Sequence, residues 1–433
     1  MRRRPRPVLL EAITFRMRGH EEASGTKYVP KKLMEEWAMK DPVKNYETYL
    51  VHEKICNKES IDNIGVRIKK EIEDGLEEAF KENHPQADTR EELNDVYSLF
   101  RQTITLPTQP EKKSEKRFID AISDGLRQSM ERYDNLVLMG QDIADYGGVF
   151  KITEGFVKKF GKGRVRNTPI CESAILGAGL GLSIKGMKAM VEMQFADFVT
   201  EGFTQIINNL AKTHWRWGQP ADVVVRMPTG AGTAAGPFHS QSNEAWFFHT
   251  PGLKIVYPSN PYDAKGLLCA AIEDPNPYLY FEHKFLYRSI REFIPEDYYT
   301  IEVGKANLIS EGTNISVITY GMGVHWAKEI IAAMPGMQAD ILDLRTLLPW
   351  DKEAVEQTVR KTNRVLILHE DCLTGGIGAE ISAWINENLF QYLDAPVMRL
   401  GSLDTPIPFA PTLENNFLPK GRIKKKIEDL MAY

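Results

Sequence analysis

The stretch ESAILGAGLGLSIKGMKAMVEMQFADF, residues 172–198, carries most of the information about the fold. It begins with an apolar, glycine-rich segment of helical length at about 173–185 and continues into a strand-like run at 188–193. A further strand-like run, residues 165–167, precedes it. Strand, helix and strand thus follow one another, an order typical of a parallel β-sheet covered by helices.

The same alternation continues on both sides of this stretch. Further short strands are predicted at 136–139, 223–227, 254–257 and 278–282, with helices at about 118–130, 197–212 and 261–273. A second alternating block begins near residue 304, with strands at 315–320, 340–344, 365–369 and 397–400, and helices near 323–334, 351–360 and 376–389. The sequence therefore predicts an α/β fold, in which a parallel-sheet domain is followed by a smaller α/β domain.

The first 105 residues differ in character from the rest. The run Val8–Ile13, behind an arginine-rich start, is interpreted as a strand, because Glu11 interrupts it too early for a signal peptide. A charged helix with an apolar period over 66–80 follows, and Pro85 ends it. Residues 106–116 hold prolines and a charge run and are interpreted as a linker. The predicted domains are 1–105, 117–300 and 301–433.

Composition places the chain among ordinary globular proteins. Hydrophobic residues make up 42% and charged residues 26%, and the net charge of −5 gives no indication of a nucleic-acid or membrane partner. No apolar run approaches the length of a membrane span. The four cysteines form no Cys-x-x-Cys pair, which argues against a zinc site and a disulfide scaffold and favours a reducing, cytoplasmic compartment: Cys56, Cys171, Cys269 and Cys372.

Candidate ligand-binding residues follow the strands, because parallel α/β domains bind ligands at the carboxyl ends of their strands. Glu172 opens the glycine-rich helix. It is either a simple partner of the helix dipole or a partly buried acid that takes part in proton transfer. Phe195 and Phe198 follow the strand at 188–193, and are either core aromatics or a platform on which a planar cofactor ring stacks.

The glycines of the segment 177–181 suggest dinucleotide binding at first sight. Leu182, however, stands in place of the third glycine of the Gly-x-Gly-x-x-Gly fingerprint. The glycines also lie within the helix rather than between strand and helix. We therefore interpret them as sites where the helix packs closely on its neighbours.

Two histidines, His239 and His20, lie in loops where a catalytic or ligand-binding role is plausible from the neighbouring residues. His239 belongs to the long glycine-rich loop 228–244, where catalysis and simple solvation are equally open. His20 lies beside Arg16 and Arg18, and two arginines near a histidine suit an anionic ligand.

Several runs of the chain resemble the beta subunit of branched-chain 2-oxo acid and pyruvate dehydrogenases. The most specific are EMQFADF at 192–198, HSQS at 239–242 and PGLKIVYPSNPYDAKGLL at 251–268. The likeness covers roughly 117–433 and includes DLRTLLPW at 343–350 and GGIGAE at 375–380. Residues 1–105 resemble the last part of the matching alpha subunit, through RMRGH at 16–20, Trp37 and Asp41-Pro42. The chain thus resembles a beta subunit fused behind the tail of its alpha subunit.

This resemblance implies a transketolase-like pyrimidine domain and a thiamine diphosphate cofactor. Glu172 would then hydrogen-bond a ring nitrogen of the aminopyrimidine, Phe198 would stack on that ring, and Gln194 would also contact the cofactor. Asp274 resembles part of a potassium-site loop. Magnesium would be bound through an alpha segment that this sequence does not contain.

The implied reaction is oxidative decarboxylation of a 2-oxo acid. The acyl group would pass to a lipoyl group on a partner acyltransferase, and the family forms alpha-two beta-two assemblies, which for a fused chain means a homodimer. His239 would serve proton and acyl transfer, and His20 would lie near the diphosphate and the reacting carbonyl. The run at Gln194–Asp197 resembles branched-chain enzymes most.

Two departures from the family pattern bear on function. Glu21 follows His20, where animal alpha subunits carry a phosphorylatable serine. The sequence also lacks the Gly-Asp-Gly run that binds magnesium and diphosphate in the family, so the chain is expected to be a piece of a longer fused enzyme, or to work with another chain, and to bind the cofactor poorly alone. The alternatives are a pyruvate or acetoin dehydrogenase component, a non-catalytic assembly module, and a transketolase-like relative. The failed glycine fingerprint disfavours a nicotinamide dehydrogenase.

Overall fold

The computed structural model describes residues 3–4, 6, 8–21 and 23–433, so part of the arginine-rich start lies outside the described residues. The chain divides after Ala87 into two compact units. The first unit carries the helices α1 (Lys31–Ala38), α2 (Pro42–His52) and α3 (Lys58–Lys81). Among the described residues, no helix has the length and apolarity that crossing a membrane requires.

In the first unit, the structure has the long helix that the sequence predicts but lacks the strand predicted near the N-terminus. The helix predicted over 66–80 is confirmed as part of α3, which Asn57 caps by accepting a hydrogen bond from the Ser60 N–H at 2.8 Å. The strand predicted at Val8–Ile13 is wrong, because residues 8–13 are exposed and have no regular structure. No neighbouring strand within the described first unit supplies the backbone partners that an extended run needs.

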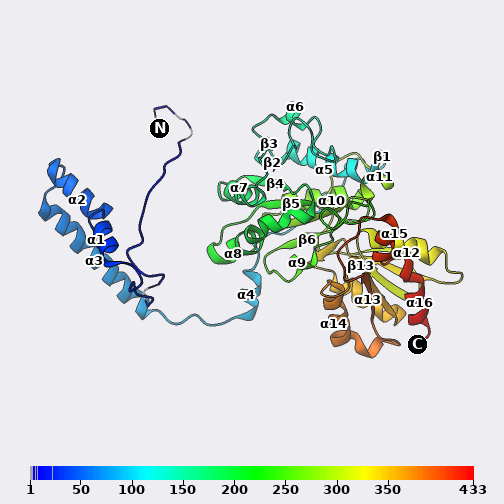
Figure 1. Ribbon diagram of the computed structural model, residues 1–433. Coiled ribbons are helices and arrows are strands. Elements are labelled where there is room, and N and C mark those ends of the chain that lie inside the picture. Colours follow the sequence, from blue (N-terminus) through cyan, green and yellow to red (C-terminus); the bar gives the residue numbers. More distant parts are fainter. Residues whose placement is uncertain (1–2, 5, 7, 22) are drawn as a thin grey trace. The chain divides into compact units, whose positions relative to one another are not determined.

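The second unit is built on a seven-stranded sheet with the order β12-β6-β7-β5-β4-β2-β3 (Figure 1). Its strands are β2 (Leu136–Gly140), β3 (Val165–Asn167), β4 (Lys188–Glu192), β5 (Val223–Thr229), β6 (Lys254–Val256), β7 (Tyr278–His283) and β12 (Thr346–Leu348). All neighbouring strands are parallel except β12, which runs antiparallel to β6. The predicted parallel sheet is therefore confirmed.

Helices cover both faces of this sheet. On one face, α5 (Phe118–Arg132) and α10 (Pro261–Glu273) pack with the even-numbered residues of β2. On the other, α7 (Glu172–Ile184) packs with the odd-numbered ones. Burial on two faces explains why these strands read as continuous apolar runs rather than as alternating ones.

A second sheet of five strands forms the C-terminal domain, in the order β14-β13-β10-β11-β9. The strands are β9 (Asn307–Ser310), β10 (Ile315–Thr319), β11 (Ala339–Asp343), β13 (Val365–Cys372) and β14 (Met398–Ser402). The helices are α12 (Met322–Ala332), α13 (Lys352–Thr362), α14 (Gly378–Leu389), α15 (Pro411–Phe417) and α16 (Ile423–Met431). The second α/β block is thus confirmed, with β9 as an antiparallel edge.

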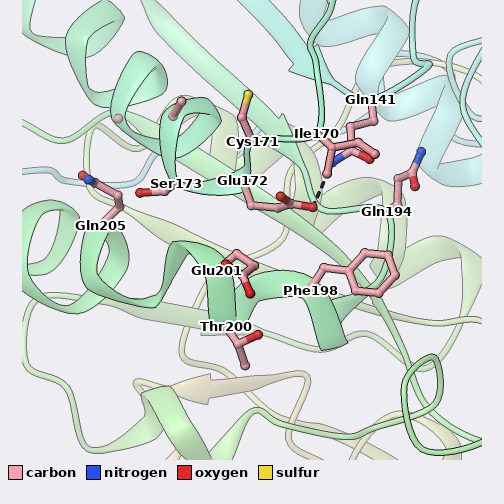
Figure 2. A pocket seen from close by; sticks show the side chains of 12 residues that line it. Gln141, Ile170, Cys171, Glu172, Ser173, Gln194, Phe198, Thr200, Glu201 and Gln205 are labelled. Carbon is pink, nitrogen blue, oxygen red and sulfur yellow. Dashed lines mark hydrogen bonds between the residues drawn. The ribbon is translucent and has the colours of Figure 1, made fainter.

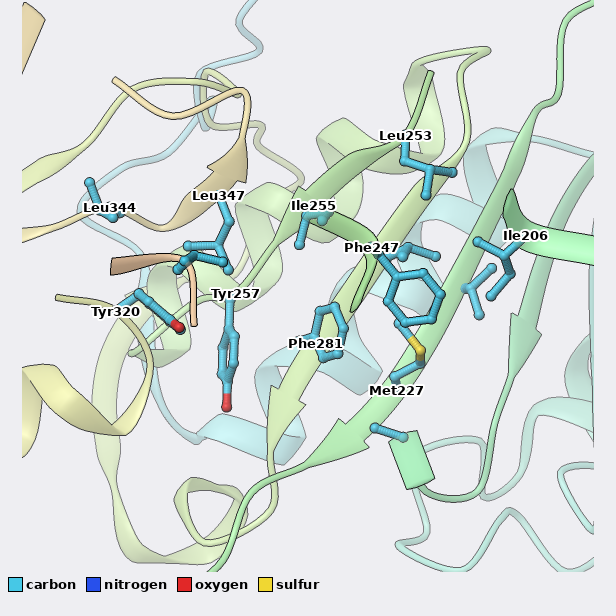
Figure 3. Close-up of a cluster of buried hydrophobic side chains, with 14 of the residues drawn as sticks. Ile206, Met227, Phe247, Leu253, Ile255, Tyr257, Phe281, Tyr320, Leu344 and Leu347 are labelled. Carbon is cyan, nitrogen blue, oxygen red and sulfur yellow. The ribbon is translucent and has the colours of Figure 1, made fainter. Parts of the chain in front are cut away.

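One apolar cluster joins the two sheets of the second unit (Figure 3). Tyr257 and Phe281, from the seven-stranded side, stack with ring centroids 5.7 Å apart. Tyr320, which follows β10, packs on Tyr257 at 5.3 Å. Together with β12, which leaves the C-terminal domain to pair with β6, this cluster fixes the two domains to one another.

Residues 97–117, which precede α5, contact the rest of the second unit. The Tyr97 hydroxyl donates to the Leu253 carbonyl at 3.0 Å, and the Ser98 N–H donates to Asn276 Oδ1 at 2.8 Å. Residues 113–117, the end of the predicted linker and the start of the next predicted domain, form β1 (Lys113–Arg117), which pairs antiparallel with β8 (Arg291–Pro295). Residues 97–117 are therefore attached to the second unit.

Candidate active site

A cavity of about 1020 Å³ opens where β2, β3 and β4 end (Figure 2). Its walls come from the loop after β2, the start of α7, and the segment after β4. The lining residues are Gln141, Ile170, Cys171, Glu172, Ser173, Ala174, Gly177, Gln194, Phe198, Thr200, Glu201 and Gln205. The cavity thus lies at the carboxyl ends of parallel strands, where ligand-binding residues were predicted from the sequence.

Glu172 is a buried carboxylate on the wall of this cavity. It is the first residue of α7, and its side chain is only 7% exposed. Gln141 Nε2 donates to Glu172 Oε1 at 2.9 Å (Figure 2), and no residue of the described chain donates to Oε2. A carboxylate that is buried and has one oxygen without a protein donor is suited to bind a polar group of a ligand.

Close packing of α7 on the sheet brings Glu172 to this place. An ideal Cβ on Gly179 would lie 3.1 Å from Val191 Cγ1. A larger residue at this position would force Val191 to shift, so the packing interpretation is confirmed for Gly179, whereas Gly181 has no neighbouring atom within 4 Å of an ideal Cβ. The approach sets the N-terminus of α7 beside the end of β4.

Gln194 and Phe198 line the same cavity from the segment after β4. Both are half-buried. The sequence predicts one helix at 197–212, but the structure has three helical segments of different type there. They are a 3₁₀ helix (Ala196–Gly202), a π-helix (Gln205–Leu210) and α8 (Ala211–Trp217). Such irregular helices occur often at functional sites.

His239 meets the aromatic residues of this segment. Its ring lies 4.8 Å from the Phe195 ring and 5.5 Å from the Phe198 ring, nearly perpendicular to each. Gln241 donates from both its backbone N–H and its side-chain amide to Asp197 Oδ1, at 3.1 and 3.0 Å. The structure therefore brings the His239 loop, Phe198 and Glu172 into one region.

Two residues near this cavity, Gln141 and Arg226, were not predicted from the sequence. Gln141 follows the buried strand β2, and this position after a strand is the only sequence feature that could have identified it as a site residue. Arg226, fully buried in β5, donates to Glu192 at 2.6 Å and to both oxygens of Glu282 at 2.5 and 2.7 Å. Burial first, and then the neighbouring Glu282 charge, hold the pKa of the Glu192 carboxyl above its usual range against the Arg226 charge. The sequence feature that could have identified Arg226 is the presence of an arginine inside an apolar strand.

Asp274 is not among the residues that line this cavity. The Asp274 carboxylate, at the end of α10, accepts hydrogen bonds from the Asn276 N–H and side-chain amide, from Lys254, and from the Tyr278 hydroxyl. The Lys254 ammonium thus lies against this carboxylate, and the potassium site expected at Asp274 stays a prediction. His20 lies exposed in the first unit.

Comparison with known proteins gives three family matches and close relatives. Residues 114–289 match the transketolase pyrimidine binding domain, 304–422 match the transketolase C-terminal domain, and 1–88 match the dehydrogenase E1 component. The chain is 46% identical to the 2-oxoisovalerate dehydrogenase beta subunit of Bacillus subtilis over 308 residues, which are 70% of this chain and 94% of that protein.

Two further relatives and one solved structure agree with these matches. The mitochondrial 2-oxoisovalerate dehydrogenase subunit beta 2 of Arabidopsis thaliana is 41% identical, covering 77% of this chain and 94% of that protein. The pyruvate dehydrogenase E1 beta subunit of Staphylococcus aureus is 38% identical, covering 73% and 98%. A split gene transketolase, described as an inactive beta4 tetramer, shares the fold, with a TM-score of 0.61 and 20% identity over 73% of this chain and 98% of that one.

The long identity to beta subunits and the E1 match at the N-terminus point to one group of enzymes. The chain belongs to the family of thiamine diphosphate-dependent 2-oxo acid dehydrogenase E1 components, as a beta subunit behind an alpha-type E1 segment.

Proposed function

We propose that this chain supplies the aminopyrimidine side of a thiamine diphosphate site for the oxidative decarboxylation of a branched-chain 2-oxo acid. The observation that carries the proposal is the buried Glu172, whose Oε1 is held by Gln141 and whose Oε2 has no donor among the described residues. Phe198 lines the same cavity. A planar ring with a protonated or protonatable nitrogen fits this combination of an aromatic wall and a carboxylate.

The bound cofactor would supply the electron sink that loss of carbon dioxide requires. The residues of this chain would bind it and manage protons. Glu172 Oε2 would hold the hydrogen of a ring nitrogen, Gln141 would fix the carboxylate in one orientation, and Phe198 would stack on the ring. Gln194 would add a polar contact from the same wall of the cavity.

His239 would move a proton at the reacting carbonyl and assist acyl transfer to a lipoyl group on a partner acyltransferase. Its place against Phe195 and Phe198 supports this role. His20, in the alpha-type segment, would face the diphosphate in the assembled enzyme. We propose a homodimer or an alpha-two beta-two-type assembly, and a cytoplasmic compartment, which four free cysteines support.

We propose that the described residues of this chain do not hold magnesium by themselves. Among the described residues, no group of three or more histidine, cysteine or acidic side chains is arranged to hold a metal ion. The sequence also contains no Gly-Asp-Gly run. The metal and the diphosphate would therefore be held by an alpha-type polypeptide that carries this run.

A branched-chain substrate is supported by the relatives. The two proteins named 2-oxoisovalerate dehydrogenase beta subunits share 46% and 41% identity with this chain, against 38% for the pyruvate enzyme. A second candidate function is that of a non-catalytic assembly module. The solved structure described as an inactive beta4 tetramer favours this for the chain in the absence of an alpha-type polypeptide.

Calorimetric titration of thiamine diphosphate with Mg²⁺ tests the split site. We expect no binding heat with this chain alone, and binding after an alpha-type polypeptide with the Gly-Asp-Gly run is added. Turnover of the completed enzyme with 3-methyl-2-oxobutanoate, compared with pyruvate, then tests the substrate. Tight binding by the chain alone would mean that the diphosphate is held by residues other than those proposed.

The substitution Glu172→Gln tests the role of the carboxylate. We expect it to lower turnover of the completed enzyme by about a hundredfold or more, because an amide cannot exchange a proton with the ring. Glu380→Gln is a matched control, since Glu380 lies exposed in the first turn of α14 and outside the cavity. Normal turnover in Glu172→Gln would overturn the assignment and leave Glu172 as a partner of the helix dipole.

The substitution His239→Ala separates acyl transfer from cofactor binding. We expect the rate of lipoamide acylation to fall by roughly a hundredfold, while the binding heat for thiamine diphosphate stays within about twofold. His249→Ala, an exposed histidine at the end of α9 (Ala245–Phe248), is the control. Equal acylation rates in His239→Ala and the unaltered enzyme would exclude His239 from this step.

A further inference from the structure

The loop that carries His239 has an unusual backbone. After β5 ends at Thr229, positive φ angles recur at every second residue: Gly230 at 91°, Gly232 at 92°, Ala234 at 53° and Gly236 at 73°. Alternation of this kind turns successive backbone N–H groups outward, where they can surround an anionic group. Such a chain needs acceptors for its N–H groups, because few of them are used within the loop.

Two carboxylates of the C-terminal domain accept these N–H groups. The Ala231 N–H donates to Glu370 Oε1 at 2.6 Å. The Gly232 N–H donates to Glu414 Oε1 at 2.9 Å, and the Ala234 N–H donates to Glu414 Oε2 at 3.1 Å. Hydrogen bonds from N–H groups to an ionised acceptor are stronger than those to a neutral one, so these three contacts are a strong attachment.

Both glutamates are themselves fixed. Glu370 lies in β13 and is 6% exposed, and its second oxygen forms a hydrogen bond with His283 Nε2 at 2.6 Å. Glu414 lies in α15 and is 3% exposed. The loop is thus held by side chains that come from a strand and a helix of the other domain, rather than by mobile surface groups.

Aromatic packing completes the contact between the domains. An ideal Cβ on Gly236 would lie 2.2 Å from the Phe409 ring, so the loop follows the surface of the C-terminal domain closely. His239 comes three residues later, and Gln241 returns the chain to Asp197 beside the Phe198 segment. The position of the imidazole therefore depends on both ends of this span.

We propose that Glu370 and Glu414 are positioning residues, which place the His239 loop from the C-terminal domain. Neither residue lines the cavity that contains Glu172. The C-terminal domain then contributes to catalysis through the geometry of this loop, in addition to its packing in the core. The proposal rests on the proposed function only in the part that His239 plays in acyl transfer.

Hydrogen–deuterium exchange on the full chain tests the attachment without any turnover. In Glu414→Gln, an amide replaces a carboxylate that accepts N–H bonds at both oxygens, so we expect the peptide covering 230–239 to exchange roughly ten- to a hundredfold faster. Glu428→Gln, an exposed residue of α16, is the control. Unchanged exchange at 230–239, or an equal increase throughout the C-terminal domain, would overturn the proposal.

A second variant separates positioning from simple loss of stability. Glu414→Asp keeps the charge but shortens the side chain, and we expect exchange between that of Glu414→Gln and the unaltered chain. In the completed enzyme, Glu414→Gln should lower lipoamide acylation at least tenfold and leave thiamine diphosphate binding within about twofold. Faster exchange together with normal acylation would refute positioning, while loss of activity in Glu172→Gln would still stand as separate support for the proposed function.

Discussion

The helices α3 and α5 have similar amphipathic sequences and very different surroundings. α3 spans 24 residues, and none of them is buried. α5 spans 15 residues, of which nine are buried against the seven-stranded sheet and α10. An amphipathic pattern therefore specifies a helix and its apolar face, but the burial of that face depends on a partner that the helix itself does not encode.

Ion pairs differ between the two units in the same way. The α3 pairs, such as Arg67–Glu71 at 3.6 Å, join side chains that are 69% and 68% exposed. Arg226, in β5, pairs with Glu192 and Glu282 at no more than 6% exposure. Exposed pairs contribute little to stability, whereas removing one member of a buried group leaves uncompensated charge.

The largest effect we expect comes from breaking the buried ion group. Arg226→Met leaves Glu192 and Glu282 facing one another without a cation, and should lower the free energy of unfolding by about 4 kcal/mol. Arg67→Met in α3 should change it by less than about 0.5 kcal/mol. Urea denaturation followed by circular dichroism measures both. Similar effects of the two substitutions would show that burial is not what separates these ion pairs.

A matched pair of leucines tests the apolar faces. Leu126→Ala in α5 removes a fully buried side chain and should cost about 3 kcal/mol. Leu76→Ala in α3, where the side chain is 52% exposed, should stay within about 0.5 kcal/mol of zero. The same denaturation experiment compares them. A large loss in Leu76→Ala would mean that the face of α3 is covered in solution, which would make the first unit more like the second.

A smaller effect concerns a buried acid and pH. Glu244 is fully buried, and burial, with the Asp371 charge adding to it, raises the pKa of Glu244 to about 8. Burial likewise raises the pKa of Asp371 to about 7. Carboxyl groups titrate near pH 4 when unfolded, so the folded chain binds more protons between about pH 4 and 8 and loses stability as the pH rises through that range.

The substitution Glu244→Gln should flatten this pH dependence. Each proton of difference contributes about 1.4 kcal/mol per pH unit, so the loss of stability between about pH 6 and 8 should shrink in the variant. Glu71→Gln, on the exposed α3, is the control and should leave the slope unchanged. Denaturation at the two pH values gives the result, and a stability that rises with pH in the unaltered chain would contradict the assignment.

Local pattern was sufficient for most strands of the two sheets in the second unit and for the residues that follow them. Glu172 and Phe198 were found because each lies in the segment that follows a strand, and parallel strands end at one edge of a sheet, whereas Gln194 came from the family resemblance. β12 and β1 were not predicted as strands, since each pairs with a partner far away in the sequence. The predicted strand at Val8–Ile13 failed for the converse reason, because it has no partner within the described first unit.

The sequence by itself determined the α/β alternation, the family and the residues at the ends of strands, because periodicity, turns and motifs act over short distances. Only the tertiary structure decided which side chains meet. Gln141 donates a hydrogen bond to Glu172, and Glu414 accepts one from the loop that carries His239. Lys254 donates a hydrogen bond to the Asp274 carboxylate. These contacts join residues from separate elements, and their positions follow from how helices and sheets pack rather than from any local preference of the chain.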